Sequence, residues 1–416
     1  MRFWSSVSAT IYLLLISILA ACGGGGGSTQ TSPSGPQSFN KQYFYVDPSG
    51  ICSTRTPCHT SLYDALRASF LSQFDSQLQL LRPGAPTDEI VVMPGIYISA
   101  APSDTVFGAG INQENNPSGQ WKIDIIAEEG PNQTFITGLG IGPCIEITDN
   151  IQLRISGFTI ADCYEYQSNI VNEDFSIYIQ SYSNVDLLID GNVFDSNGSE
   201  SAVIGISPCF VNVTNLNIRI TRNTFKNNQG SIYLQRYPID ANPNYSSDIL
   251  IDNNIVYNNQ AGIWIGNFTN AFNNISVDIV YNTIINNSNT GLAIQQTNGI
   301  NAKNNIVHGN GIDIRGSESG HNYWDRYGVP FKRNYITNNL VGEVSNLSAA
   351  SNIVDDPLLV SAPSEDFTPR LDSPVIDSGA TLSSYVIETD FLSNQRVRDG
   401  DADMISIPDI GAIEIQ

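Results

Sequence analysis

The sequence predicts an all-β solenoid, a fold in which short strands stack coil upon coil around one apolar core. Two features of the composition support this: Asn, Ile, Gly, Ser and Thr dominate, and helix-forming Lys and Glu are scarce. Such a composition favours strands joined by many turns. The third observation is a motif that recurs at coil spacing, which a β-sandwich would not explain.

The motif is a short alternating strand, an asparagine, an apolar pair, a polar turn and a second alternating strand. One copy, from Ile220 to Gln235, reads ITRNTFKNNQGSIYLQ. A single coil cannot bury its own apolar side, so we expect coils stacked about 4.8 Å apart, with asparagine side chains hydrogen-bonded along the stack. The motif asparagines, at spacings of 31, 31, 28 and 23 residues, are Asn192, Asn223, Asn254, Asn282 and Asn305, with Phe158 at the same place in an earlier copy.

The N-terminus has the pattern of a secretory signal followed by a tether. In residues 1–21, Arg2 precedes an apolar run too short to span a bilayer. The run ends in LAAC, which resembles the lipobox of bacterial lipoproteins and implies lipidation of Cys22. Residues 22–42 are rich in Gly, Ser and Pro, which predicts a flexible tether reaching about 25 Å. With Gly23 in place of Asp, the resemblance implies an outer-membrane lipoprotein, periplasmic or surface-exposed.

The net charge of -22 and the pI of about 4.2 limit the partners. Nucleic acid and anionic lipid both bind clustered Lys and Arg, so neither is expected to bind. We expect a monomer that meets the membrane only through the lipid on Cys22. An acidic polymer would be repelled as well, unless calcium bridged the two.

Six cysteines fit an oxidising compartment. Cys52 and Cys58 are close enough in sequence to form a small disulfide loop. Cys144, Cys163 and Cys209 leave one odd thiol. A Cys144–Cys163 bridge between neighbouring coils is one option, but we favour buried free thiols.

The two ends of the chain resemble known modules. YFYVDPSG from Tyr43, SLYDAL, and DEIVVMPGIYI from Asp88 resemble the N-terminal cap of right-handed parallel β-helix proteins. This resemblance implies a cap helix over roughly 61–81 and a right-handed parallel β-helix within 43–350. SPVIDSGA and PDIGAIE resemble the choice-of-anchor Q module, placed at 351–416, although TDFLSNQRV lacks its usual glycine-bearing turn. We expect these caps to cover the open strand edges at the two ends.

Strand alternation predicts which side chains point outward. In the strand after each asparagine turn, the outward residues form one column, namely Tyr178, Gly205, Tyr233, Trp264, Ala293 and Asp313. The column two residues further on is Gln180, Ser207, Gln235, Gly266, Gln295 and Arg315.

This face has the chemistry of a sugar-binding track about 25–30 Å long. Aromatic rings stack on the C–H face of a pyranose, and amides bind its hydroxyls. The resemblance to β-helix proteins, which often handle polysaccharides on such a face, agrees with this. Equally, exposed aromatic residues satisfy strand propensity alone. The predicted polysaccharide-binding residues are Tyr178, Gln180, Tyr233, Gln235, Trp264, Gln295 and Asp313.

Two alternative functions follow from the same fold. A lyase acting on a uronate-containing polysaccharide would need a basic residue, for which Arg236 and Arg315 are the candidates, with Arg219 and Lys226 as further cations near the face. Calcium is the one cofactor indicated, and the loop DGDADMISIPD offers Asp399, Asp401 and Asp403 as ligands, against the interpretation of a solvated acidic loop. The other alternative is a surface spacer or adhesin without catalysis.

Overall fold

The computed structural model forms one compact unit from Phe39 to Gln416, apart from the first 38 residues. Cys22, the tether before residue 39, and Cys209 lie outside the described residues, so lipidation stays a prediction. Within the described part, no helix is both long and apolar enough to cross a bilayer. The described residues are 39–75, 79–99, 120–138, 144–148, 150–163, 175–180, 184–198, 202–206, 215–235, 246–266, 275–295, 300–316, 335–337, 339–341, 344–345, 352–382, 387–398, 400 and 406–416.

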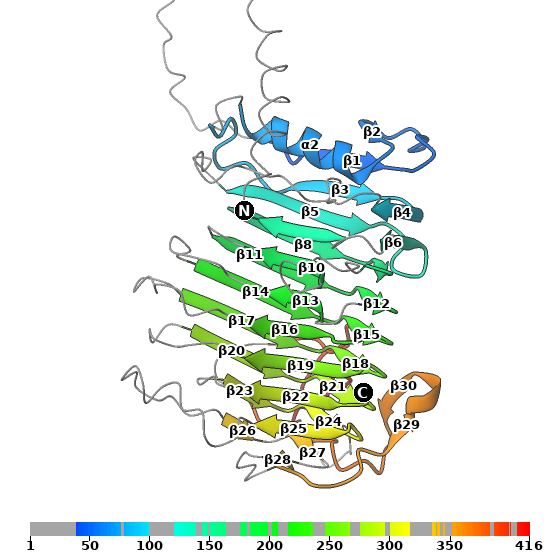
Figure 1. The fold of residues 1–416 in the computed structure, drawn as a ribbon, viewed down its shortest axis with the longest axis vertical. Coiled ribbons are helices and arrows are strands. Elements are labelled where there is room, and N and C mark those ends of the chain that lie inside the picture. The colour runs from blue at the N-terminus through cyan, green and yellow to red at the C-terminus, as the bar shows by residue number, and fades with distance from the viewer. Residues whose placement is uncertain are drawn as a thin grey trace, which may run out of the picture. The chain divides into compact units, whose positions relative to one another are not determined.

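Three parallel sheets wind around one core, and each full coil adds a strand to each sheet (Figure 1). Among the described strands, sheet 1 has 11, sheet 2 has 9 and sheet 3 has 8. The predicted all-β parallel β-helix is therefore confirmed.

Each sheet is a row of short strands in which every strand bonds to the next. Sheet 1 consists of β2 (Cys58–His59), β1 (Tyr43–Val46), β3 (Asp88–Val92), β5 (Trp121–Ala127), β8 (Ile151–Ser156), β11 (Val185–Asp190), β14 (Asn215–Thr221), β17 (Ser246–Asp252), β20 (Ile275–Val280), β23 (Ile300–Lys303) and β26 (Tyr335–Thr337). Sheet 2 consists of β4 (Gly95–Ser99), β6 (Thr134–Gly138), β9 (Thr159–Ala161), β12 (Val193–Asp195), β15 (Thr224–Lys226), β18 (Ile255–Tyr257), β21 (Thr283–Ile285), β24 (Ile306–His308) and β27 (Leu340–Val341). Sheet 3 consists of β7 (Ile145–Thr148), β10 (Phe175–Gln180), β13 (Ala202–Ile206), β16 (Ile232–Gln235), β19 (Ala261–Gly266), β22 (Thr290–Gln295), β25 (Ile312–Gly316) and β28 (Val344–Ser345).

The core is a set of apolar columns, because alternate residues of every strand point inward. Burying one isoleucine side chain contributes about 1.5–3 kcal/mol to folding. Phe194 and Phe225 stack in sheet 2 with ring centroids 4.7 Å apart. One inward column of sheet 1, buried throughout, is Ile125, Ile155, Ile189, Ile220, Ile251 and Ile279.

The predicted asparagine column forms a continuous hydrogen-bonded ladder between sheets 1 and 2. In each rung, one Oδ1 accepts the backbone N–H and the Nδ2 of the asparagine one coil earlier, at 2.9–3.1 Å. Phe158 begins it by donating its N–H to Asn192. The ladder extends beyond the predicted Asn305 through Asn339 to Asn352.

A second ladder, which the sequence analysis missed, lies five residues after the first. Its rungs have the same geometry, with bonds of 2.8–3.1 Å. It fixes the turn between sheets 2 and 3. Its members are Asn197, Asn228, Asn259, Asn287 and Asn310, and it ends on Asp313.

From Asn192 to Asn305, the residue before each asparagine of the first ladder has a left-handed backbone. Here φ is 65° at Gly191, 54° at Arg222 and Asn253, 55° at Tyr281 and 56° at Asn304. This conformation makes the sharp corner between sheets 1 and 2. The four non-glycine side chains at this corner meet the C-terminal segment described below.

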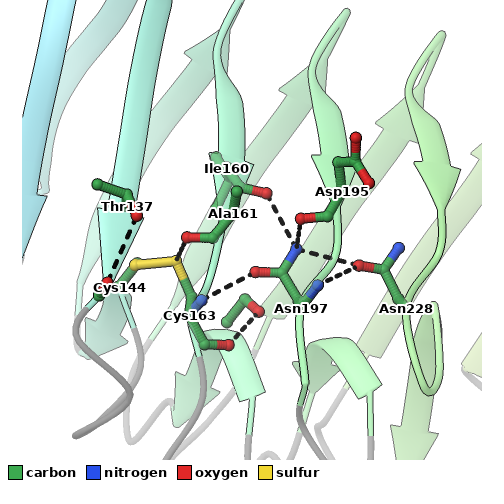
Figure 2. The surroundings of a disulfide bond; sticks show 10 residues. Thr137, Cys144, Ile160, Ala161, Cys163, Asp195, Asn197 and Asn228 are labelled. Atoms are coloured by element: carbon green, nitrogen blue, oxygen red, sulfur yellow. Dashed lines mark hydrogen bonds between the residues drawn. A yellow bond between two sulfur atoms is a disulfide. The ribbon is translucent and has the colours of Figure 1, made fainter.

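Among the described residues, two disulfides cross-link the N-terminal half. The predicted Cys52–Cys58 bridge is present, with Cα atoms 5.6 Å apart. Cys144 and Cys163 also form a bridge, so our preference for free thiols was wrong. The reason is positional: Cys163 occupies the second ladder's first place and donates its N–H to Asn197, and Cys144 lies beside it (Figure 2).

Helix α2 (Leu62–Gln73) covers the N-terminal end of the core. Ser61 caps it by accepting the N–H of Asp64, and its buried side includes Leu62 and Leu66. The helix ends before the predicted residue 81, because Phe74 is extended and forms a β-bridge with Leu80.

The C-terminal segment, residues 352–416, packs mainly along the side of the coil stack. Of its described residues, Asn352 and Ile353 bond to the last coil at Asn339 and Val341. The rest lies outside sheets 1 and 2 and includes the antiparallel pair β29 (Leu359–Ser361) and β30 (Asp366–Pro369), joined by the short helix η2 (Ala362–Ser364). One apolar contact cluster joins the strand residues Ile255, Tyr257, Ile285 and Ile306 to Phe367, Val375, Ile410, Ala412 and Ile413.

Arg396 is a buried cation at the contact between the C-terminal segment and the coils. It is 3% exposed, and its guanidinium lies 4.1 Å from the centroid of the Tyr281 ring. It donates to Asn253 Oδ1 at 2.6 Å and to Glu414 Oε2 at 3.2 Å. Burial raises the pKa of nearby Asp409 to about 7, although its carboxylate accepts a backbone N–H from Ile415.

We predict that Asn254→Ala lowers the free energy of unfolding by about 3 kcal/mol or more, because it leaves the N–H and Nδ2 of Asn223 and the carbonyl of Ile220 without this partner, and each buried group left unpaired costs about 1–3 kcal/mol. The change removes a fully buried amide that bonds to Asn223 on one side and Asn282 on the other. Urea denaturation measures the loss. The matched control is Asn217→Ala, an exposed amide bonded to Asp186, where we expect less than about 1 kcal/mol. Equal losses would contradict a structural role for the ladder.

We also predict a pH dependence of stability from Asp409. An acid whose pKa is higher in the folded protein binds its proton more tightly there, so stability falls as pH rises from about 4 to about 7 and then levels off. In Asp409→Asn the thermal midpoint should therefore fall less over this window than in the wild type. Asp372→Asn, an exposed acid of the same segment, should keep the wild-type slope. Parallel slopes for wild type and Asp409→Asn would refute the assignment.

Candidate functional site

Sheet 3 carries a line of aromatic and small residues on its outer side. The register pairs Tyr178 with Gly205, Gly205 with Tyr233, Tyr233 with Trp264, and Trp264 with Ala293. This register matches the alignment predicted for these five positions. We call them the aromatic row.

Trp264 is the most exposed ring of the row. Its strand neighbours Ile263 and Ile265 are buried, so alternation directs the indole outward, where it is 39% exposed. Its ring meets Tyr233 edge to face, with centroids 5.1 Å apart and planes at 66°. Tyr178 and Tyr233 are partly exposed. The row therefore presents one open indole supported by a tyrosine.

Small residues make the floor beside this indole. A Cβ atom at Gly266 would lie 3.2 Å from Trp264 Nε1, so the indole reaches over the glycine of its own strand. Ala293, the next residue in the row, is buried. The sequence pattern assigns Gly266 to the amide column and does not indicate its position under the indole. The feature of the sequence that indicates this position is a glycine two residues after an outward-facing tryptophan.

Asp313 does not belong to the row, which corrects the prediction. Leu292 pairs with Ile314 and Ala293 with Arg315. The link from Asn310 to Ile314 is one residue shorter than the link from Asn287 to Leu292, and this shift moved the alternation. Asp313 is instead 3% exposed and accepts two 2.8 Å bonds from Asn310, where it ends the second ladder.

For the predicted glutamine column, the structure describes the backbone pairing. The backbone of Gln235 pairs with Gly266, and Gly266 pairs with Gln295, while Gln180 pairs with Thr148. The three glutamine side chains lie outside the described part of the structure. Their contacts with a ligand stay a prediction.

Of the predicted cations, the structure describes Arg315, Arg219 and Lys226, and it does not bring these three together. Arg236 lies outside the described residues. Arg315 is partly exposed and pairs with Ala293, so it lies on β25, the strand that follows the last strand of the row. Arg219 and Lys226 belong to the other sheets and pair with carboxylates, at 2.9 Å from Asp252 and at 3.2 Å from Glu365.

The predicted calcium ligands cannot be placed either. Asp399, Asp401 and Asp403 lie outside the described residues. Elsewhere in the described chain, no group of three or more His, Cys, Asp and Glu is arranged to hold a metal ion. Calcium binding by the acidic loop stays a prediction.

We predict that Gly266→Val moves the Trp264 indole, because the new Cβ would crowd Nε1. The ¹⁹F resonance of 5-fluorotryptophan at position 264, assigned with Trp264→Phe, should shift or broaden. Thr137→Val, on the outer side of sheet 2, is the control and should leave that resonance in place. An unmoved resonance in Gly266→Val would show that the glycine does not position the ring.

No protein-family model and no curated protein matches this chain. Several solved structures are similar to it at low identity. The A-module of mannuronan C-5 epimerase AlgE6 from Azotobacter vinelandii is 13% identical, over 68% of this chain and 74% of that one, with a TM-score of 0.32. Pectate lyase Pel9A is 12% identical over 91% and 97%, with a TM-score of 0.34, and XylC, solved with xylose, is 13% identical over 79% and 65%, with a TM-score of 0.37. We draw no functional argument from these similarities.

Proposed function

We propose that this protein binds polysaccharide on the outer side of sheet 3, with Trp264 as the main stacking ring. The observation that carries the proposal is the open indole of Trp264, supported by Tyr233 and extended over Gly266. A large ring left partly in water next to small residues forms a flat apolar platform.

Such a platform suits the C–H face of a sugar ring. The indole is rigid, so little conformational entropy is lost when a ligand packs on it, and its face carries partial negative charge that attracts polarised C–H groups. Pyranose hydroxyls at the rim need hydrogen-bond partners, and the phenolic groups of Tyr178 and Tyr233 can both donate and accept. The platform and its polar rim therefore match a sugar better than a purely apolar ligand.

The repeat of the row also suits a polymer rather than a single sugar. Its five residues come from five successive coils, which places the outermost ones about 19 Å apart at ordinary strand spacing. Tyr178 and Trp264 can then contact different units of one chain. Contacts spread along a polymer add their energies without a deep pocket.

We predict that Trp264→Ala weakens binding to any recognised glycan at least about tenfold, a loss typical of a central aromatic contact. A glycan array followed by affinity electrophoresis measures the change. Tyr63→Ala is the matched control, because Tyr63 is an exposed ring on α2, away from sheet 3. Equal retention of Trp264→Ala and wild type on every positive glycan would reject the proposal.

A further inference from the structure

We infer that the polymer recognised by the aromatic row is uncharged rather than a uronate-containing polyanion. This inference rests on the proposed function and assigns its ligand class. It follows from the positions of the positively charged side chains in the described part of the chain.

The row itself holds no ionisable cation or carboxylate. From Tyr178 to Ala293 its side chains are aromatic, methyl or absent, over five successive strands of sheet 3. An acid stands in register at one end, Glu146 beside Tyr178. A cation stands at the other end, Arg315 beside Ala293. Among the described residues, a carboxylate on each sugar unit would therefore lie against the indole and tyrosine rings without a counter-charge in the row between these ends.

Burying a carboxylate against such rings is unfavourable, because the charged group loses water and gains no partner. Uncharged hydroxymethyl and hydroxyl groups have a smaller desolvation cost and find partners at the rim. The contact surface itself thus discriminates between neutral and acidic sugars, independently of the charge of the whole chain.

Cations elsewhere in the described chain are mostly committed to carboxylates on other faces. These pairs hold the cap, sheet 1 and the C-terminal segment, so they are not available to sheet 3. These ion pairs include Arg82–Asp88, Arg154–Asp190, Arg222–Asp190, Arg219–Asp252, Lys226–Glu365 and Arg396–Glu414.

The charge of the whole chain acts in the same direction. With a net charge of -22, the chain repels a polyanion during approach, and screening limits this effect to roughly 8–10 Å at physiological ionic strength. A neutral polymer experiences no such repulsion, so its affinity should depend little on salt.

The test compares one polymer backbone with and without charge. Purified full-length protein is titrated with fully methyl-esterified homogalacturonan and with the de-esterified form, and then with xylan, glucomannan and alginate, each with calcium or with EDTA. We expect the neutral polymers that bind to do so at least about tenfold more tightly than the charged ones, with little salt dependence and with loss in Trp264→Ala. Arg315→Gln should leave neutral binding unchanged.

The opposite result is equally clear. Binding of de-esterified homogalacturonan or alginate that equals the neutral affinity, depends on Trp264 and falls with salt or with Arg315→Gln would overturn the inference and leave the proposed function standing. If no polymer, charged or neutral, shows a dependence on Trp264, the proposed function itself fails.

Discussion

The vertical hydrogen bonds between stacked asparagines are the constraint on which the rest of this structure depends. Each turn of a β-helix leaves backbone groups inside the molecule, out of reach of water, and unpaired groups there are costly. A buried asparagine satisfies them with its own amide, and its oxygen accepts the N–H of the coil before. The same bonds set the register, so a one-residue slip would break a rung of each ladder.

Because the register is fixed at two corners, residues at equivalent positions become vertical neighbours on all three outer faces. On sheet 1 this places Asp190 between Arg154 and Arg222, and Asp252 beside Arg219. At the first corner, the left-handed residues turn their side chains outward, and the C-terminal segment binds them. Asn304, for example, both donates to and accepts from the backbone of Ala380.

The three faces therefore differ in what they leave for a ligand. Ion pairs occupy part of the outer side of sheet 1. Apolar residues of the C-terminal segment cover the C-terminal half of sheet 2. Sheet 3 instead carries the aromatic row, in which three rings stand beside two small residues. This division of the surface agrees with the proposal that sheet 3, with Trp264 at its centre, is the face that binds a ligand.

The sequence by itself determined the solenoid, the first ladder and the outward position of Trp264, because strand alternation and the spacing of Asn192 to Asn305 are local and repetitive. The tertiary structure decided what depends on loop length and on distant contacts. The shorter link after Asn310 moved Asp313 from the row into the second ladder. The Cys144–Cys163 bridge and the burial of Arg396 against Tyr281 likewise needed residues far apart in sequence to meet. A periodic pattern reports which residues repeat, whereas the offset between coils and the path of a non-repeating segment are settled only by packing.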